Sequence, residues 1–273
     1  MGAPTLDDIE LQLLLEAIFL RYHQDFRSYS LASIRRRLAA ARDSLGFATL
    51  SAMQDAILRD ARVFAALLQF LSVQVSDLFR DPSFYRALRQ EIVPVLRTYP
   101  SLKIWIAGCS RGEEVYSFAI LLREEGLLDR TILYATDLNP EALREAEAGV
   151  YPRERVPAFT ENHRLAGGKG SLSSHYTARY GAAVFDRALR KQIVFSDHSL
   201  ATDSVFAEVH VASCRNVLIY FDRALQERAL GLLKGSLVRR GFLGLGAKES
   251  LHSSEHAAEF REVVRGERWY QRC

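Results

Sequence analysis

The stretch that most constrains the fold is residues 102–122, LKIWIAGCSRGEEVYSFAILL. Its apolar run, Ile104 to Ala107, predicts a buried strand, and the apolar residues that follow Glu113 at helical spacing predict a helix. The turn between them, Gly108 to Gly112, holds two glycines where the backbone bends sharply. Turns of this kind hold ligands at the carboxyl ends of strands in α/β sheets. We therefore expect a strand, a ligand-binding turn that includes Gly108, and a helix.

The same turn spells G-x-S-x-G, which in α/β-hydrolases makes the serine, here Ser110, the attacking nucleophile. That arrangement needs an acid and then a histidine later in the chain. The next predicted strand, Thr131 to Thr136, instead ends at Asp137, 25 positions past Gly112 (137 − 112). An acid about 20 residues after a glycine-rich turn binds ribose hydroxyls. This spacing favours a nucleoside-containing cofactor, and the lack of the G-x-G-x-x-G pattern favours a mononucleoside over a dinucleotide. The alternative for Asp137 is a cap on the following helix.

Composition sets the class of protein. The 273 residues allow one large domain or two small ones, and 48% apolar and 25% charged residues are typical of globular proteins. No apolar run reaches the roughly 18 residues of a membrane span, and the first residues are acidic rather than basic. We expect a cytoplasmic protein without membrane insertion. The net charge of +3 is too small to indicate nucleic acid.

Metal and disulfide chemistry find little support in the sequence. The three cysteines, Cys109, Cys214 and Cys273, are odd in number and far apart. The pattern H-x-x-E-H, from His252 to His256, matches an inverted zinc-protease motif, but none of the 17 residues that follow (273 − 256) is a histidine. We therefore predict no metal site.

Residues 5–70 carry helical periodicity and no strand pattern, which predicts a small helical domain. The first helix is expected to bury Ile9, Leu13, Ile18 and Tyr22, the second to run from Leu31 to Leu45 and stop at Gly46, and the third to run from Leu50 to Phe70.

The second of these helices is rich in arginine. Arg35, Arg36, Arg37 and Arg42 have Asp43 as the one acid nearby in the sequence. They form either an ordinary solvated surface or an electropositive face that attracts an acidic partner.

The rest of the chain alternates strand and helix patterns, which predicts an open, doubly wound α/β sheet. We divide the chain into a helical domain (1–70), a segment lining a cleft or simply linking domains (71–84), and an α/β domain (85–273) with a small antiparallel insertion at about 173–195. The remaining predicted elements are a loop over 149–170 with room for one helical turn, a strand over 209–213, a helix over 223–239, a strand over 242–246, a helix over 255–264 and a strand over 268–272.

Six segments together resemble the chemotaxis-receptor methyltransferases, the CheR family. In order they are SVQVSDLFRDPSFY, IWIAGCSRGEEVYSFAILL, ILYATDLNPEAL, FSDHSLATD, CRNVLIYFD and GFLGLGAKESL. The resemblance covers nearly the whole chain. It implies a Rossmann-like fold, S-adenosylmethionine as methyl donor (leaving S-adenosylhomocysteine), and methyl esters formed on glutamates of a chemoreceptor's cytoplasmic helices.

The resemblance also implies roles for individual residues. Arg80 and Tyr220 match the pair that faces the acceptor carboxylate, and the insertion is similar to a receptor-docking subdomain. The acidic receptor helices would be the partner of the arginine face, and a monomer is expected. Cofactor contacts are implied for Gln74, Ser76, Arg80, Ala107, Gly108, Glu114, Asp137, Ser199, Leu200, Arg215 and Asn216. The chain departs from the family pattern at Gln74, Ser76, Arg111 and Ser199.

The chemistry fits this implication. A glutamate has a pKa of about 4.3 and is ionised at neutral pH, so methyl transfer needs no general base. Catalysis then depends on orientation, which Arg80 and Tyr220 can provide by hydrogen bonding to the acceptor. Two alternatives stay open: a serine hydrolase that uses Ser110, and a non-catalytic adaptor that keeps receptor docking only.

Overall fold

The computed structural model describes residues 4–72, 74 and 76–273, and the chain forms two compact units. The first unit comprises Met1–Val73, Ser199–Ser204 and Tyr220–Ala229, and the second comprises Gln74–His198, Val205–Ile219 and Leu230–Cys273. The domain boundaries expected from the sequence stay a prediction, because a division into compact units does not test them. Val73 and Val75, in the segment 71–84, lie outside the described residues.

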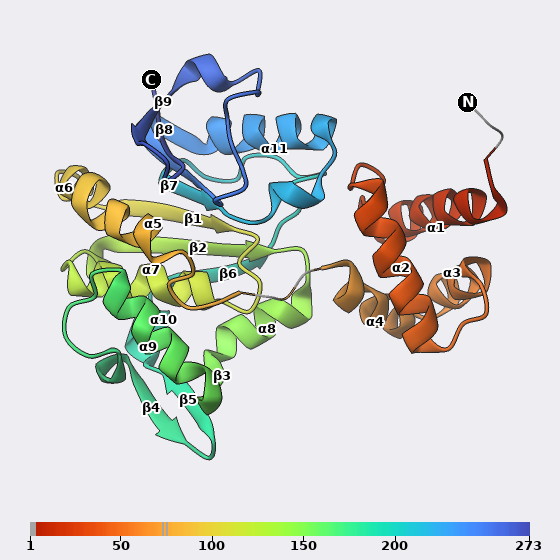
Figure 1. Ribbon diagram of the computed structural model, residues 1–273, viewed down its shortest axis with the longest axis horizontal. Helices are drawn as coiled ribbons and strands as arrows, with labels where there is room; N and C mark the ends of the chain where they lie inside the picture. The colour runs from red at the N-terminus through yellow and green to blue at the C-terminus, as the bar shows by residue number, and fades with distance from the viewer. Residues whose placement is uncertain (1–3, 73, 75) are drawn as a thin grey trace. The chain divides into compact units, whose positions relative to one another are not determined.

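Four helices build most of the first unit: α1 (Leu6–Tyr22), α2 (Leu31–Leu45), α3 (Leu50–Arg59) and α4 (Ala61–Leu71) (Figure 1). Helix α1 starts with a capping box between Thr5 and Asp8, and α2 ends at Gly46 with a φ of 78°. The prediction of a single helix over 50–70 is wrong. The segment forms two helices, because Asp60 leaves the helical conformation (φ −133°) and its carboxylate caps α4.

The buried face of α1 also differs from the predicted one. Leu11, Leu14, Leu15 and Ile18 are buried, whereas Ile9 and Leu13 are 43% and 53% exposed. Apolar residues occupy several sides of this helix, so periodicity alone does not select the side that packs.

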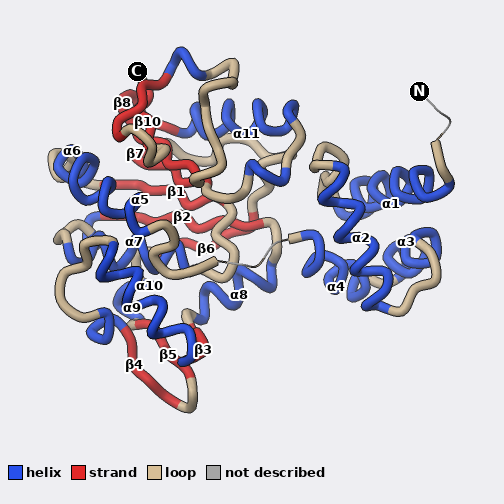
Figure 2. The backbone as a smooth tube through the Cα atoms, viewed as in Figure 1, coloured by secondary structure: helices blue, strands red, loops and turns tan. Residues whose placement is uncertain are grey.

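The second unit contains a seven-stranded sheet of order β6-β2-β1-β7-β8-β10-β9 (Figure 2). The first five strands in that order are parallel to one another, and β10 is antiparallel to both β8 and β9. This arrangement confirms the predicted α/β sheet. The strands are β1 (Leu102–Ala107), β2 (Thr131–Asp137), β6 (Ile193–Asp197), β7 (Val209–Cys214), β8 (Leu237–Leu245), β9 (Phe260–Val264) and β10 (Trp269–Arg272).

A second, three-stranded antiparallel sheet has the order β3-β5-β4, from β3 (Val150–Pro152), β4 (Tyr176–Arg179) and β5 (Ala182–Phe185). The predicted insertion is therefore present, but its limits of 173–195 need correction. They omit β3, which pairs with β5 from a distant part of the chain, and they include the start of β6, which belongs to the main sheet.

Three other predictions are corrected by the structure. The loop expected over 149–170 contains helix α9 (Val156–Leu165), because Pro157 lies in the first turn, where proline is tolerated. The helix expected over 255–264 is a short 3₁₀ turn followed by β9, which the hairpin with β10 holds extended. Helix α11 (Arg223–Ser236) ends before residue 239 because β8 already starts at Leu237.

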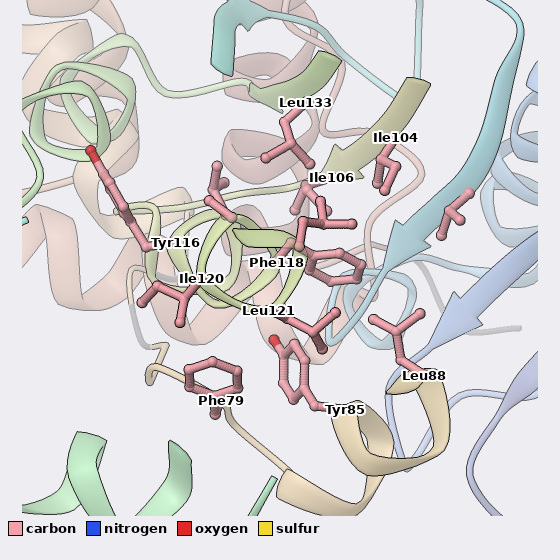
Figure 3. Close-up of a cluster of buried hydrophobic side chains, with 14 of the residues drawn as sticks. Phe79, Tyr85, Leu88, Ile104, Ile106, Tyr116, Phe118, Ile120, Leu121 and Leu133 are labelled. Carbon is pink, nitrogen blue, oxygen red and sulfur yellow. The ribbon is translucent and has the colours of Figure 1, made fainter. Parts of the chain in front are cut away.

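The core of the second unit surrounds helix α7 (Glu113–Glu124), whose Val115 and Phe118 to Leu122 are buried. Figure 3 shows Phe118 and Leu121 among side chains of β1, β2 and the helical segment that begins with α5 (Pro82–Ala87). The apolar run of β1 is buried on both faces, as expected for a parallel strand covered on both sides.

The other helical elements are α5 (Pro82–Ala87), a π-helical turn (Leu88–Ile92), α6 (Val93–Leu96), α8 (Pro140–Ala148), α10 (Arg187–Arg190) and 3₁₀ turns at Leu128–Arg130, Arg153–Arg155, Leu172–His175, Leu218–Tyr220 and Ala257–Glu259. Among the described residues, no helix combines the length and apolarity that crossing a membrane requires.

Candidate functional site

The strand order places a switch point between β1 and β7. Strand β1 pairs with β2 on one side and with β7 on the other, and the chain reaches β7 only after β6 has been added beyond β2. In open α/β sheets, ligands bind at such a switch point, outside the carboxyl ends of the strands. The loops that leave β1 and β7 are therefore the candidate site.

The loop after β1 is the predicted glycine turn. Gly108 and Gly112 have φ values of 73° and 91°, which side chains rarely allow. A Cβ on Gly108 would lie 2.5 Å from Cγ2 of Val217, which belongs to the loop after β7. The amides of Gly108 and Cys109 both donate to the carbonyl oxygen of Thr136, at 2.8 and 2.9 Å. The turn is thus tied to the end of β2 and packs closely against the second loop.

Asp137 closes this turn. Its carboxylate accepts hydrogen bonds from the amides of Ser110 (2.8 Å) and Asn139 (3.0 Å), and the residue is 8% exposed. Burial raises the pKa of Asp137, and the backbone donors partly oppose that rise. The cap of α8 is the side chain of Asn139, which accepts from the amide of Glu141 (3.0 Å), so Asp137 is not the helix cap.

Ser110 has the geometry of a strained turn, but among the described residues its hydroxyl bonds to a side chain that is not a base. Its φ is 51°, and its hydroxyl donates to the amide oxygen of Gln74 at 2.8 Å. A serine nucleophile needs a hydrogen-bonded base, which the side-chain amide of glutamine cannot provide. This contact weighs against the hydrolase hypothesis and places Gln74 beside the turn.

Arg215 connects the second loop to the predicted acceptor-binding segment. Its side chain is 1% exposed and pairs with Glu114 (3.1 Å) and Asp81 (2.8 Å). It also donates to the carbonyl oxygen of Arg80 at 2.8 Å. Burial by itself lowers the pKa of Arg215, and the neighbouring groups, above all Glu114, outweigh burial so that the pKa is raised. Ser213, at the end of β7, donates to Glu114 at 2.6 Å.

The backbone around Arg80 is held in an unusual conformation. Phe79 and Asp81, on either side of it, have φ values of 52° and 56°. Phe79 is fully buried, and its amide donates to the hydroxyl of Ser117 at 2.7 Å. Residues in such conformations persist when their surroundings over-determine them, and they concentrate at functional sites. Together with the bonds from Arg215, these contacts hold the Arg80 backbone in one place.

The sequence analysis missed Arg155, which holds the segment before Arg80. Its guanidinium pairs with Glu113 (2.6 Å) and Asp77 (2.9 Å) and donates to the carbonyl oxygen of Ser76. Burial raises the pKa of Glu113, against the effect of Arg155. No local sequence signal indicated this role, because the segment was expected to be a loop.

Three further predicted site residues, Ser199, Leu200 and Tyr220, belong to the first unit, whereas Ala107 and Asn216 belong to the second. The amide of Ser199 donates to Asp203 at 2.9 Å, and Leu200 is 7% exposed. The carbonyl oxygen of Tyr220 accepts from the amide of Ser30 at 2.8 Å, and its ring lies 4.4 Å below the Arg37 guanidinium.

These contacts correct the predicted arginine face. Arg37 is 8% exposed and donates to the carbonyl oxygen of Leu71, so it is not a surface residue. Burial lowers its pKa. Arg36 is exposed, Arg35 pairs with Asp8, and Arg42 pairs with Asp43 at 2.7 Å. At most three of the four arginines can form an exposed face.

A group of metal-ligand type appeared only in the structure. One potential ligand atom from each of Glu124, His163 and His175 lies within 4.8 Å of the others. The Glu124 carboxylate, however, accepts from Nε2 of His163 (2.7 Å) on one oxygen and pairs with Arg89 on the other. These partners satisfy a buried carboxylate without an ion, so we interpret the group as an ionic network between α7 and α9.

Comparison with known proteins agrees with this geometry. The model of the CheR methyltransferase SAM-binding domain matches residues 74–266, and that of the CheR methyltransferase all-alpha domain matches residues 9–72. The chain is 54% identical to the putative methyltransferase Cher3 of Pseudomonas putida, over 97% of each chain. It is 29% identical to a chemotaxis protein methyltransferase of Listeria innocua, over 83% of this chain and 84% of that one.

A third relative is chemotaxis protein methyltransferase 2 of Pseudomonas aeruginosa, 31% identical over 68% of this chain and 66% of that protein. These findings favour a methyltransferase over the hydrolase and adaptor hypotheses. The model that matches residues 74–266 is that of a SAM-binding domain, so the methyl donor is S-adenosylmethionine, and the two family models together account for both the helical segment and the sheet. The chain belongs to the CheR methyltransferase family.

Proposed function

We propose that this protein transfers the methyl group of S-adenosylmethionine to glutamate side chains of a chemoreceptor cytoplasmic domain, forming glutamate methyl esters. The observation that carries the proposal is the direct connection between the two loops of the site. Arg215 holds the backbone of Arg80, the proposed acceptor-binding residue, and pairs with Glu114 at the start of the helix that follows the glycine turn. Cofactor and acceptor groups thereby share one rigid support.

The residues present fit the methyl donor. Asp137 offers a buried carboxylate for ribose hydroxyls beside the glycine turn, where Gly108 leaves no room for a side chain next to Val217. The bound donor supplies a methyl group on a positively charged sulfur. The residues proposed to hold it are Gln74, Ser76, Arg80, Ala107, Gly108, Glu114, Asp137, Ser199, Leu200, Arg215 and Asn216.

Arg80 and Tyr220 are proposed to orient the acceptor. A planar guanidinium binds a carboxylate through two parallel hydrogen bonds, and a phenol can donate one more. The acceptor is already ionised at neutral pH, so neither residue has to remove a proton. Their contribution is alignment of the carboxylate oxygen with the methyl carbon, since orientation of bound reactants supplies much of such a rate enhancement.

Receptor recognition is proposed for two surfaces. Arg35, Arg36 and Arg42 would attract acidic receptor helices through long-range electrostatics, without Arg37. The three-stranded sheet of β3, β4 and β5 is the proposed docking subdomain. We also propose that the protein acts in the cytoplasm as a monomer.

The test is transfer of a radiolabelled methyl group to purified receptor cytoplasmic domains. We expect base-labile label on glutamate residues, released as methanol. Arg80→Ala should lower kcat by roughly 100-fold, the cost of a misplaced reactant. Arg164→Ala, which removes an exposed arginine paired with Glu161, serves as the control and should keep the parent rate. Label on another residue type, or an undiminished rate in Arg80→Ala, would contradict the proposal.

A further inference from the structure

Glu249 occupies an unusual place behind the loop that leaves β7. It follows β8 in the sequence GLGAKES and is 4% exposed. Its carboxylate accepts four backbone hydrogen bonds. One oxygen, Oε2, accepts from Gly246 (2.7 Å) and Asn216 (2.9 Å), and the other, Oε1, accepts from Val217 (2.8 Å) and Ile219 (3.3 Å).

These bonds explain how the loop keeps its shape. Beyond Cys214 the chain leaves the sheet, and Asn216 adopts a φ of 60°, so its amide and those that follow have no strand partner. Buried amides need acceptors, and the Glu249 carboxylate supplies them. A Cβ on Gly246 would lie 2.7 Å from Oε2 of Glu249 and 2.8 Å from the Asn216 nitrogen. The contact therefore depends on a residue without a side chain at 246.

The loop that Glu249 holds is the one that supports the site. Arg215 at its start bonds to Glu114 and to the Arg80 backbone. Val217 packs against Gly108, so the position of its backbone sets the space beside the glycine turn. Tyr220, the second residue proposed to orient the acceptor, follows Ile219 directly in sequence. A shift of this loop would move donor-binding and acceptor-binding groups together.

We propose that Glu249 is a positioning residue for methyl transfer. It acts through the loop 215–219 and contacts neither donor nor acceptor, and this role rests on the proposed cofactor site. The carboxylate is required because its two oxygens both accept. An amide in its place would turn an NH₂ donor toward two backbone N–H donors. Side-chain length and packing would be unchanged, so the substitution isolates the hydrogen bonds.

The test compares Glu249→Gln with Glu124→Gln. Glu124 is an equally enclosed carboxylate (side chain 4% exposed), but it lies at the far end of α7 from the glycine turn and outside the proposed site. Both variants lose a buried charge, and we expect both to unfold at lower temperature. Only Glu249→Gln disturbs the loop. A second variant, Gly246→Ala, disturbs the same contact from the other side.

Three measurements separate positioning from general stabilisation, each made well below the unfolding temperature. Hydrogen exchange of the amides of residues 215–219 should accelerate in Glu249→Gln and Gly246→Ala and stay unchanged in Glu124→Gln. Calorimetric titration with S-adenosylhomocysteine should show roughly tenfold weaker binding in the first two variants, the scale of lost hydrogen bonds to a charged group. At saturating donor, kcat should fall as well.

The outcomes also distinguish this proposal from the proposed cofactor site. If the amides of residues 215–219 in Glu249→Gln exchange hydrogen at the parent rate, the positioning role is overturned, whatever the affinity for S-adenosylhomocysteine. Faster exchange with unchanged affinity and kcat would overturn it too, since the loop would then not govern the chemistry. If the parent protein itself failed to bind S-adenosylhomocysteine, the cofactor site would be wrong, and the positioning role that rests on it would fall with it.

Discussion

Two loops at the carboxyl edge of the sheet are each closed by one buried carboxylate, but the two carboxylates are used differently. Asp137 accepts hydrogen bonds from the backbone amides of Ser110 and Asn139, and Glu249 accepts from four backbone amides. A carboxylate has about four lone-pair sites, so Asp137 keeps capacity for a ligand and Glu249 does not. Burial raises the pKa of both groups. The comparison separates the acid proposed to bind the methyl donor from the acid proposed to support a loop.

The largest effect is expected when the second loop loses its charged anchor. Arg215→Ala removes a guanidinium that is 1% exposed and leaves Glu114 without its cation. Breaking a buried ion pair from one side costs about 3–5 kcal/mol of unfolding free energy. Denaturant unfolding measures it, and Arg164→Ala, from an exposed pair, should change the unfolding free energy by less than about 1 kcal/mol. Similar losses in the two variants would refute the anchoring role.

The next effect concerns the first loop and affects binding more than folding. Asp137→Asn removes the charge that is proposed to accept from the ribose, so S-adenosylhomocysteine should bind about 1.5–3 kcal/mol more weakly. Calorimetry measures the affinity. Asp129→Asn, an exposed acid before the opposite end of β2, is the matched control and should bind like the parent. Unchanged affinity in Asp137→Asn would remove Asp137 from the cofactor site.

A pH titration sharpens the contrast with a third buried carboxylate. The pKa of Glu124 is held well below its ordinary value by His163, His175 and Arg89, whose effects exceed that of burial. A depressed folded-state pKa gives stability that is present above the unfolded-state pKa, near 4.3, and lost as the pH falls toward the folded-state value. The difference in unfolding free energy between the parent and Glu124→Gln should therefore shrink below pH 4. A difference that grows on acidification would contradict the ionic interpretation.

Asp137 and Glu249 should show the opposite sign. A raised folded-state pKa means that the native state binds the proton more tightly, so these groups lose stabilising effect as the pH rises through the interval between the unfolded and folded values. Comparing Glu249→Gln with the parent over the same pH series checks this. A parent advantage that increases smoothly with acidity fits the expected sign, and one that disappears with acidity does not.

The smallest effect is expected at Ser110. Ser110→Ala removes the hydroxyl bond to Gln74 but keeps the backbone amide that donates to Asp137. The loss of one neutral hydrogen bond costs about 0.5–1.5 kcal/mol. Methyl transfer should therefore continue within roughly tenfold of the parent rate. Complete loss of activity would support a nucleophilic role for the Ser110 hydroxyl.

Part of this site was predictable because its signals are local. The strand, glycine turn and helix of residues 102–122 lie in one continuous stretch, and the spacing to Asp137 follows from the length of one helical crossover. The end of α2 at Gly46 was likewise predicted from a single residue and is confirmed. Such features depend on backbone conformation and on periodicity over one or two elements.

Other parts could not be predicted, because they join distant segments. Glu249 acts on a loop 30 to 33 residues away in sequence, and Arg155 on a segment 78 and 79 residues away. Arg37 was predicted to lie on the surface, but its contacts with Tyr220 and Leu71 bury it. Strand β9 carries a weak helical pattern, and its hairpin partner β10 decides its conformation.

The sequence by itself determined the α/β character of the sheet, the glycine turn and the acid that faces it. Each of these is set by backbone geometry and by apolar spacing over a few residues. The tertiary structure alone decided which charges are buried, which carboxylate binds amides of the chain, and which side of α1 packs. Those outcomes depend on how desolvation is offset by partners that come from elsewhere in the chain, and such partners exist only once the chain has folded.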